Sequence, residues 1–185
     1  MSAGLRTPYA VGGLVYLRPL DMEDAEQLII WINDRAISQT LEFRWPMSRH
    51  QEEDYIQTLY TSKTDMTLGI GLQADNRLIG CAGLHGIDTI NRRAAFGVFI
   101  GDTDDWGHGY GTDATRLMID VAFERLNLRR LELDVHDFNP GARRVYDALG
   151  FQLEGVRREH TYWQGRYRDT HLMGLLRSEY QPPSR

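Results

Sequence analysis

The segment Trp106-Gly107-His108-Gly109-Tyr110-Gly111-Thr112 has three alternating glycines between an apolar run and an amphipathic stretch. Glycine lets successive backbone N–H groups converge at positive φ, and a helix N-terminus adds unpaired donors and a partial positive charge. Together these features predict a cradle for a phosphate group.

The flanking segments predict a strand before this loop and a helix after it. Residues 94–100 read AAFGVFI, a short apolar run suited to a buried strand. After the loop, apolar side chains recur at helical spacing over roughly four turns. These side chains belong to Ala114, Leu117, Met118, Val121 and Ala122.

Two better-known phosphate motifs fit this loop less well. A P-loop needs a lysine directly after its last glycine, and the chain has one lysine, Lys63. The dinucleotide motif GxGxxG requires glycine where Thr112 stands. Asp134, about twenty residues further on, keeps the dinucleotide interpretation open as an alternative.

The loop resembles the acyl-CoA pyrophosphate loop of the GNAT N-acetyltransferases, whose pattern is Gln/Arg-x-x-Gly-x-Gly/Ala at the head of a helix. Trp106 replaces the usual Gln or Arg, as in the variant WGxGYGT of the branch that acetylates ribosomal-protein N-termini and of its spermidine-acetylating relatives. A second segment is similar to the family's LxV…N-x-x-A-x-x-x-Y-x-x-x-G-F pattern. Its matching residues are Leu133, Val135, Asn139, Ala142, Tyr146, Gly150 and Phe151. The resemblance runs from about residue 17 to residue 176.

The resemblance implies that acetyl-CoA is the cofactor, with its diphosphate on the loop and its pantetheine arm along the preceding strand; no metal is expected. Trp106 is expected to pack at the loop rather than bind through its ring. The expected cofactor contacts are Val98, Phe99, Ile100, Trp106, Gly107, His108, Gly109, Tyr110, Gly111, Thr112, Asn139, Arg143, Arg144 and Tyr146.

Two catalytic roles also follow from the resemblance. Tyr146 aligns with the family's general acid, which protonates the departing sulfur, and the backbone N–H of Phe99 is expected to stabilise the thioester oxygen. Both positions have simpler interpretations. Helical spacing also makes Tyr146 a core aromatic, and residues 98–100 also suit an ordinary central strand.

The general base is not identified by the sequence. Many relatives carry Glu in the setting A-E-x-G on the strand before the loop, where this chain has Ala94-Ala95-Phe96-Gly97. Four side chains are candidates for deprotonating the acceptor, and water is a fifth possibility. The four are His85, Glu42, Asp134 and His136.

The acceptor is expected to bind between the early helices and the last hairpin, because the family varies these parts. The candidate contacts are Asp34, Glu42, Trp45 and Tyr162. Transfer of acetyl to a small amine, such as a polyamine, an amino sugar or an amino acid, is the first hypothesis. A peptide N-terminus is the alternative acceptor, and a non-catalytic acyl-CoA binding module is the third hypothesis.

The chain reads as one α/β (α+β) domain over residues 14–180, with a flexible N-terminus at 1–13 and a tail at 181–185. The expected order is βααβββαβαββ, the GNAT order, which gives a mixed, mostly antiparallel sheet of about seven strands with about four helices. Ser48 with Gln51 predicts a capping box, Asn139 a helix cap, and Gln164-Gly165 the turn of a closing hairpin.

Composition limits the remaining possibilities. With 185 residues, 42% of them apolar, the chain suits one domain with a substantial core. Its net charge of −5 argues against nucleic-acid binding and mildly favours a cationic partner. Cys81 excludes an internal disulfide because it is the one cysteine. No membrane span or signal peptide is recognisable, so a cytoplasmic protein is expected. The aromatic hairpin residues Tyr162, Trp163 and Tyr167 are expected either to wall the acceptor site or to form a homodimer face.

Overall fold

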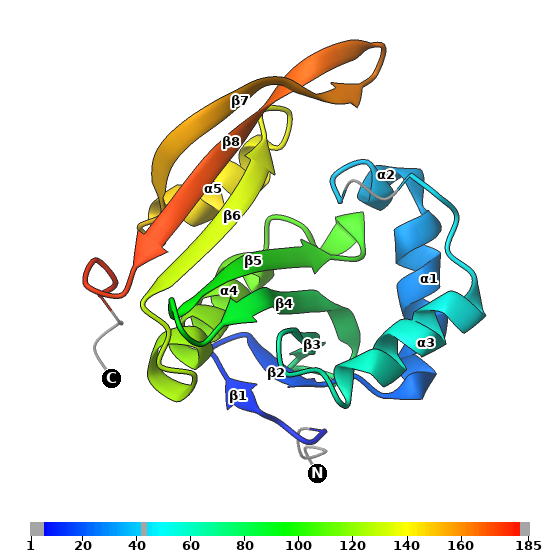
Figure 1. The fold of residues 1–185 in the computed structure, drawn as a ribbon. Coiled ribbons are helices and arrows are strands. Elements are labelled where there is room, and N and C mark those ends of the chain that lie inside the picture. Colours follow the sequence, from blue (N-terminus) through cyan, green and yellow to red (C-terminus); the bar gives the residue numbers. More distant parts are fainter. Residues whose placement is uncertain (1–5, 42–43, 182–185) are drawn as a thin grey trace.

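The computed structural model describes residues 6–41 and 44–181. Within these residues one eight-stranded sheet runs in the order β1-β2-β3-β4-β5-β6-β8-β7 (Figure 1). The strands are β1 Ala10–Val11, β2 Val15–Pro19, β3 Met66–Leu72, β4 Leu78–Asp88, β5 Arg93–Ile100, β6 Arg130–His136, β7 Gln152–Trp163 and β8 Arg166–Leu176. β7 and β8 form the predicted closing hairpin.

The helices are α1 Ala25–Asn33, α2 Arg35–Ser38, α3 Arg49–Leu59, α4 Tyr110–Asp120 and α5 Pro140–Ala148. Short 3-10 turns at Met22–Asp24 and Thr103–Asp105 precede α1 and the glycine loop, and a π-helical turn at Val121–Arg125 follows α4. The capping box of Ser48 and Gln51 is confirmed at the start of α3. The mixed, mostly antiparallel GNAT architecture agrees with the sequence expectation.

The strands β5 and β6 form the one parallel pair of this sheet, and they separate after three paired positions. Ladder pairing covers Arg93 with Arg130, Ala94 with Leu131 and Ala95 with Glu132. Beyond Ala95, β5 pairs only with β4 on its other side, while β6 continues alongside β8. The sheet therefore opens between β5 and β6 from Phe96 onward.

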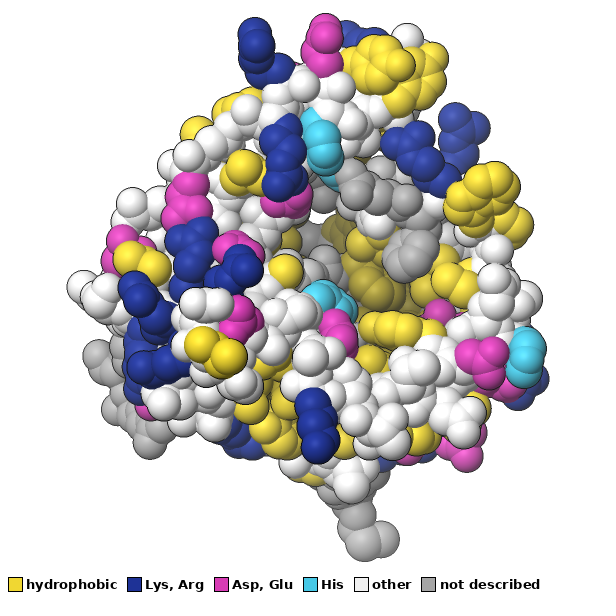
Figure 2. Space-filling model, in the orientation of Figure 1, with side chains coloured by type: hydrophobic (Ala, Val, Ile, Leu, Met, Phe, Trp, Pro, Cys, Tyr) yellow, Lys and Arg dark blue, Asp and Glu magenta, His cyan; other side chains and the backbone are white. Residues whose placement is uncertain are grey.

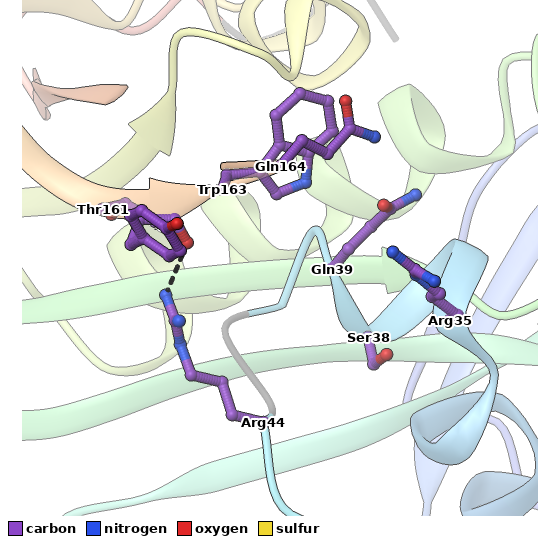
Figure 3. Close-up of a pocket in the computed structure, with 8 residues that line it drawn as sticks. Arg35, Ser38, Gln39, Arg44, Thr161, Trp163 and Gln164 are labelled. Carbon is purple, nitrogen blue, oxygen red and sulfur yellow. Dashed lines mark hydrogen bonds between the residues drawn. The ribbon is translucent and has the colours of Figure 1, made fainter. Parts of the chain in front are cut away.

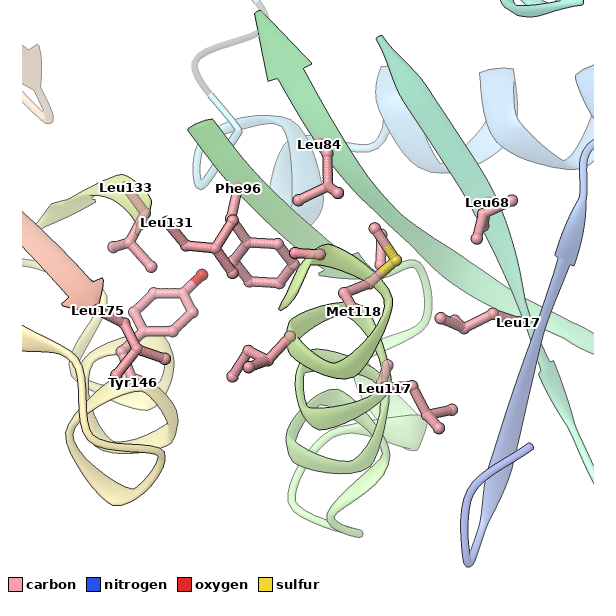
Figure 4. Packing of buried hydrophobic residues seen from close by; sticks show 14 of the residues in the cluster. Leu17, Leu68, Leu84, Phe96, Leu117, Met118, Leu131, Leu133, Tyr146 and Leu175 are labelled. Atoms are coloured by element: carbon pink, nitrogen blue, oxygen red, sulfur yellow. The ribbon is translucent and has the colours of Figure 1, made fainter. Parts of the chain in front are cut away.

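Two hydrophobic clusters hold the helices to the sheet. The larger one packs α4 and α5 against it, with Met118 of α4 fully buried (Figure 4). The smaller one groups α1, α2 and α3 with Cys81 of β4. Burial raises the pKa of the Cys81 thiol, which suits the expected role of a small buried hydrophobe.

The N-terminal part of the sheet begins earlier than the sequence indicates. Residues 1–13 are expected to be loose, but β1 pairs with β2 through Ala10 opposite Leu17. The N–H of Tyr9 also donates to the Leu17 carbonyl at 2.7 Å. A two-residue strand has too little periodicity to stand out in a sequence, so its pairing is a tertiary effect. Among the described residues, no helix is long and apolar enough to cross a membrane.

Candidate active site

A cavity of about 860 Å³ lies where β5 and β6 separate. It is lined by the second half of β5, the glycine loop, the end of β6 and the first turns of α5. Figure 2 shows this face of the molecule hollowed, with hydrophobic side chains on the floor and arginine or lysine side chains near the rim. The cavity thus joins the two segments on which the family resemblance rests.

The glycine loop has the geometry of an anion cradle. Gly107 and Gly109 adopt φ of 80° and 84°, and Gly109 is the N-cap of α4. The first helical hydrogen bond runs from the Asp113 N–H to the Gly109 carbonyl at 3.0 Å. The amides of residues 110–112 therefore lack an i−4 partner, and their residues line the cavity. Three free donors at a helix N-terminus suit a diphosphate.

Side-chain contacts anchor both ends of this loop. The Trp106 indole N–H donates to the Ile100 carbonyl at 3.0 Å, so Trp106 fixes the loop to the end of β5. The Asp105 carboxylate faces the cavity but accepts two hydrogen bonds from Arg77, at 2.7 and 2.9 Å. These bonds hold the pKa of Asp105 below its usual range. Arg77 therefore offsets a negative charge that would otherwise face an incoming phosphate.

His108 differs from the other loop residues predicted to contact the cofactor. Its ring stacks on Tyr110 with centroids 5.6 Å apart, and it is exposed outside the cavity lining. The sequence predicts that His108 supplies its backbone N–H while its side chain faces outward or stacks; the stacking is confirmed, and the N–H contact stays a prediction.

The N–H and carbonyl groups of β5 point alternately toward β4 and toward the open side of the sheet. The Gly101 N–H donates to Ile79 of β4 at 2.8 Å, so the Ile100 carbonyl in the same trans peptide faces away from β4, where Trp106 binds it. A Cβ on Gly80 would collide with the Phe99 carbonyl oxygen, so that carbonyl faces β4 and the Ile100 N–H faces the cavity.

This alternation corrects the predicted oxyanion donor. The Phe99 N–H faces β4, because it belongs to the preceding peptide of an extended strand, in which successive N–H groups point to opposite sides. The Ile100 N–H faces the cavity instead. The Phe99 side chain packs edge-on against Trp31, with ring centroids 6.3 Å apart. The side to which each N–H group points depends on how the strand pairs with its neighbour, and the sequence pattern does not specify that pairing.

Tyr146 lies at the inner wall of the cavity and in the larger hydrophobic cluster at once. Its ring contacts Phe96 and Phe151 at centroid distances of 6.3 and 5.6 Å (Figure 4). Only 5% of the residue is exposed, and burial raises the pKa of its hydroxyl to about 12. The two interpretations of Tyr146 given above are therefore compatible.

The start of α5 contributes one of the two predicted arginines. Asn139 caps the helix, since its side-chain oxygen accepts from the Ala142 N–H at 3.1 Å, and it lines the cavity together with Arg144. Arg143 instead donates to Asp147 at 2.9 Å and contacts His171 at 3.0 Å on the β8 side. The prediction that Arg143 binds the cofactor is therefore corrected: the helical rotation between neighbours turns it away.

Of the four base candidates, two line the cavity. Asp134 does so, but its carboxylate forms an ion pair with Arg157. His136 is 7% exposed, and its Nδ1 lies 3.2 Å from the Thr170 hydroxyl. His85 is corrected: it faces Asp65 at 3.6 Å, outside both cavities described here. Glu42 lies outside the described residues.

A second, smaller cavity of about 210 Å³ lies between α2 and the tip of the β7–β8 hairpin (Figure 3). Its lining is mostly polar and includes two arginines. The lining residues are Arg35, Ser38, Gln39, Arg44, Thr161, Tyr162, Trp163 and Gln164. Gln39 and Trp163 also line the larger cavity, so the two spaces adjoin at these side chains.

Of the predicted acceptor contacts that the structure describes, only Tyr162 lines a cavity. Asp34 is corrected to a helix cap, since its carboxylate accepts from the Ala36 N–H at 2.7 Å. Trp45 is also corrected: it is 86% exposed and lines neither cavity. The side of a loop that faces the hairpin depends on contacts between residues far apart in the chain. The presence of an Asp or a Trp in the sequence does not indicate that side.

Trp163, one of the hairpin aromatics expected to wall the acceptor site, lines both cavities. Its ring stacks on Phe138 at 4.4 Å, and Phe138 stacks on His136 at 4.8 Å. The stack joins the hairpin tip to the end of β6. Its only signal in the sequence was the aromatic cluster beside the Gln164-Gly165 turn.

Comparison with known proteins agrees with this geometry. The family model described as an acetyltransferase (GNAT) domain matches residues 15–152. The chain is 30% identical to the uncharacterized N-acetyltransferase p20 of Bacillus licheniformis, over 89% of this chain and 93% of that protein. It is 31% identical to the putative ribosomal N-acetyltransferase YdaF of Bacillus subtilis, over 90% and 93% of the two chains.

Among solved structures, the spermidine N-acetyltransferase of Vibrio cholerae in complex with CoA and spermine superposes with a TM-score of 0.83 at 29% identity. The match covers 90% of this chain and 97% of that one. The matched family region contains the open β5 strand, the glycine loop and the whole of α5, and GNAT enzymes take their acyl group from acetyl-CoA. The chain therefore belongs to the GNAT family and is an acetyl-CoA-dependent N-acetyltransferase.

Proposed function

We propose that the protein transfers acetyl from acetyl-CoA to the primary amine of a small molecule, by direct attack within a ternary complex. The observation that carries this proposal is the junction of the two cavities at Gln39 and Trp163. The larger cavity has the size and donors for the coenzyme, and the smaller one, at about 210 Å³, suits a compact acceptor. The CoA and spermine complex of the Vibrio cholerae relative is consistent with a small amine acceptor.

The residues that hold the coenzyme follow from the donors in the larger cavity. The amides of residues 110–112 and the α4 N-terminus bind the diphosphate. The outward-facing backbone of Val98 and Ile100 pairs with the pantetheine arm, where β6 has separated from β5. Arg144 and Asn139 contact the coenzyme from α5. Bound acetyl-CoA supplies a thioester whose carbonyl carbon the acceptor amine attacks.

Three groups of the chain then act on the reaction. The Ile100 N–H donates to the oxygen that gains negative charge. His136 takes the proton from the acceptor amine, since Asp134 is engaged with Arg157. The Tyr146 hydroxyl protonates the departing sulfur, and its pKa of about 12 keeps it protonated at any physiological pH.

Thiol release measured with acetyl-CoA and a panel of acceptors tests this function. The panel contains amino acids, amino sugars, polyamines and short peptides, each with free amines. Release with one or more of the small amines supports the proposal. Release with peptides alone would instead identify the protein as an N-terminal acetyltransferase. Coenzyme binding by calorimetry without release for any acceptor would favour a binding module.

A further inference from the structure

The smaller cavity is lined by two arginines, whereas a cationic polyamine needs negatively charged groups. We infer that its ligand is a small primary amine that also carries an oxyanion, a carboxylate or a phosphate, which Arg35, Arg44 and the Trp163 indole N–H bind. This inference rests on the proposed function, because it names the acceptor class of that same site.

The two arginines supply positive charge that no acid among the described residues matches. Within residues 6–41 and 44–181, no ion pair involves Arg35 or Arg44, and no acidic side chain lines the smaller cavity. Arg44 donates one hydrogen bond, to the Tyr162 carbonyl at 3.1 Å (Figure 3), which leaves most of its five donors. Two guanidinium groups at one cavity, with no described acid to neutralise either, favour an anionic ligand.

Trp163 provides an independent observation. Its indole nitrogen is buried and has no hydrogen-bond partner among the described residues, although Trp163 lines both cavities. An indole N–H only donates, and a buried donor without a partner costs free energy that a ligand can recover by accepting from it. An oxyanion that reaches this nitrogen supplies the acceptor that the described residues do not provide.

The remaining polar groups fit the same ligand. Ser38, Thr161 and the amides of Gln39 and Gln164 can each donate, and each can also accept. A polyamine presents only cationic donors at neutral pH, so it would meet two guanidinium groups and an indole N–H. The ammonium groups of the polyamine and the two guanidinium groups repel each other, and the N–H donors of the cavity would remain unpaired.

The junction of the cavities orients such an acceptor. An oxyanion between α2 and the hairpin tip places the rest of the molecule toward Gln39 and Trp163, where the larger cavity begins. The amine then points to the end of β5 and to His136, which is joined to Trp163 through the Phe138 stack. The anchoring charge and the reacting nitrogen thus occupy different cavities.

Matched acceptors provide the first test. Thiol release is measured for the standard amino acids against their α-carboxamides, for glucosamine 6-phosphate against glucosamine, and for spermidine. We expect one oxyanion-bearing member to exceed its partner without the oxyanion in kcat/KM by about tenfold or more. The two pairs distinguish a carboxylate from a phosphate. A preference for spermidine or for the partners without the oxyanion overturns the inference while leaving the proposed function intact.

Variants and direct binding provide the second test. In Arg35→Gln and Arg44→Gln we expect the ratio of kcat/KM between the oxyanion-bearing acceptor and its partner without the oxyanion to fall about tenfold. Arg166→Gln is the matched control, because Arg166 is exposed at the same hairpin tip but lines neither cavity. An equal fall in the control would show a general effect of surface charge and contradict a specific site.

Calorimetry on the CoA-saturated protein keeps the inference testable without turnover. The amino acids and glucosamine 6-phosphate are the probes, and we expect one to bind, with affinity about tenfold weaker in Arg44→Gln. Binding that depends on the arginines, together with absent thiol release, would support the site and contradict the proposed transfer. Absence of binding for every charged probe would overturn the inference.

Discussion

Tyr146 combines packing and chemistry in one side chain. Its ring belongs to the larger hydrophobic cluster, against Phe96 and Phe151, while the residue also lines the coenzyme cavity. Packing on two aromatic rings fixes the hydroxyl in one direction, which is what positioned proton transfer requires. A core role and a general-acid role thus use different atoms of the same residue.

Replacement of Tyr146 by Phe tests the general-acid role. The ring remains, so packing is preserved, but the proton donor is removed. We expect kcat to fall about a hundredfold or more, with little change in the KM for acetyl-CoA. Steady-state thiol release measures both parameters, and a thermal melt checks that the variant is folded. A kcat within about threefold of the wild-type value would contradict the general-acid role and show that Tyr146 serves only in packing.

Burial of Tyr146 also predicts a pH dependence of stability. Its pKa of about 12 in the folded protein exceeds the ordinary value of 10.0, so the unfolded chain releases the proton first as pH rises. Stability is therefore complete below pH 10 and is lost toward pH 12. Between pH 9 and 11.5 the wild type should lose about 2 kcal/mol relative to Tyr146→Phe. Urea unfolding of both proteins at both pH values measures this difference. An equal loss of the free energy of unfolding in the two proteins would contradict the prediction.

At the scale of the element, the glycine loop and α4 act as one unit. Gly109 at φ of 84° ends the loop and begins the helix, so the turn itself aims the free amides of residues 110–112. Trp106 ties the unit to β5, and Asp113 accepts from the amides of Leu14 and Val15, at 2.8 and 3.1 Å, which ties it to β2. The cradle is therefore held rigidly before a ligand arrives, which lowers the entropic cost of binding.

Replacement of Gly109 by Ala tests this unit. A Cβ strains the backbone at positive φ, so the loop shifts and the amides lose their common aim. We expect the Kd for CoA to rise about tenfold or more. Gly165→Ala is the matched control, since Gly165 has φ of 83° at the hairpin turn with open space around it. Calorimetry measures the Kd for CoA of both variants. Equal Kd values would show that the glycine loop does not take part in binding CoA.

At the scale of the whole molecule, the site depends on how the sheet divides. β5 belongs to the part that carries α1–α3, whereas β6 belongs to the part with the β7–β8 hairpin (Figure 1). The two parts share only three paired positions along β5 and β6, together with the helices that pack across them. A coenzyme in the gap contacts both parts.

Coenzyme binding should therefore stabilise the whole fold. At a free CoA concentration of about 100 times Kd, linkage adds about 2.7 kcal/mol to the free energy of unfolding. For a chain of this size, Tm should rise by roughly 5 to 10 °C. A thermal melt with and without CoA measures the shift, and CoA lacking its nucleotide part, as pantetheine, should give much less. Equal shifts with pantetheine would show that the loop amides contribute little.

Sequence patterns predicted the elements of the site well, because these depend on local physics. The glycine loop, the helix after it, the cap at Asn139 and the hairpin turn at Gln164-Gly165 each follow from a few neighbouring residues. Failures occurred where the direction of a side chain or of an N–H group mattered. The Phe99 N–H faces β4, although the residue lines the cavity, and the side chains of Arg143 and His85 contact Asp147 and Asp65 outside it.

By itself the sequence determined the order of the elements, the phosphate cradle and the family, since glycine conformations and helix periodicity act over short distances. Only the tertiary structure decided where β5 leaves β6 and which residues meet across the smaller cavity. Arg44 and Tyr162, 118 residues apart, meet where α2 and the hairpin tip face each other across the smaller cavity. Such contacts depend on the free energy of the whole fold, and no local pattern encodes them.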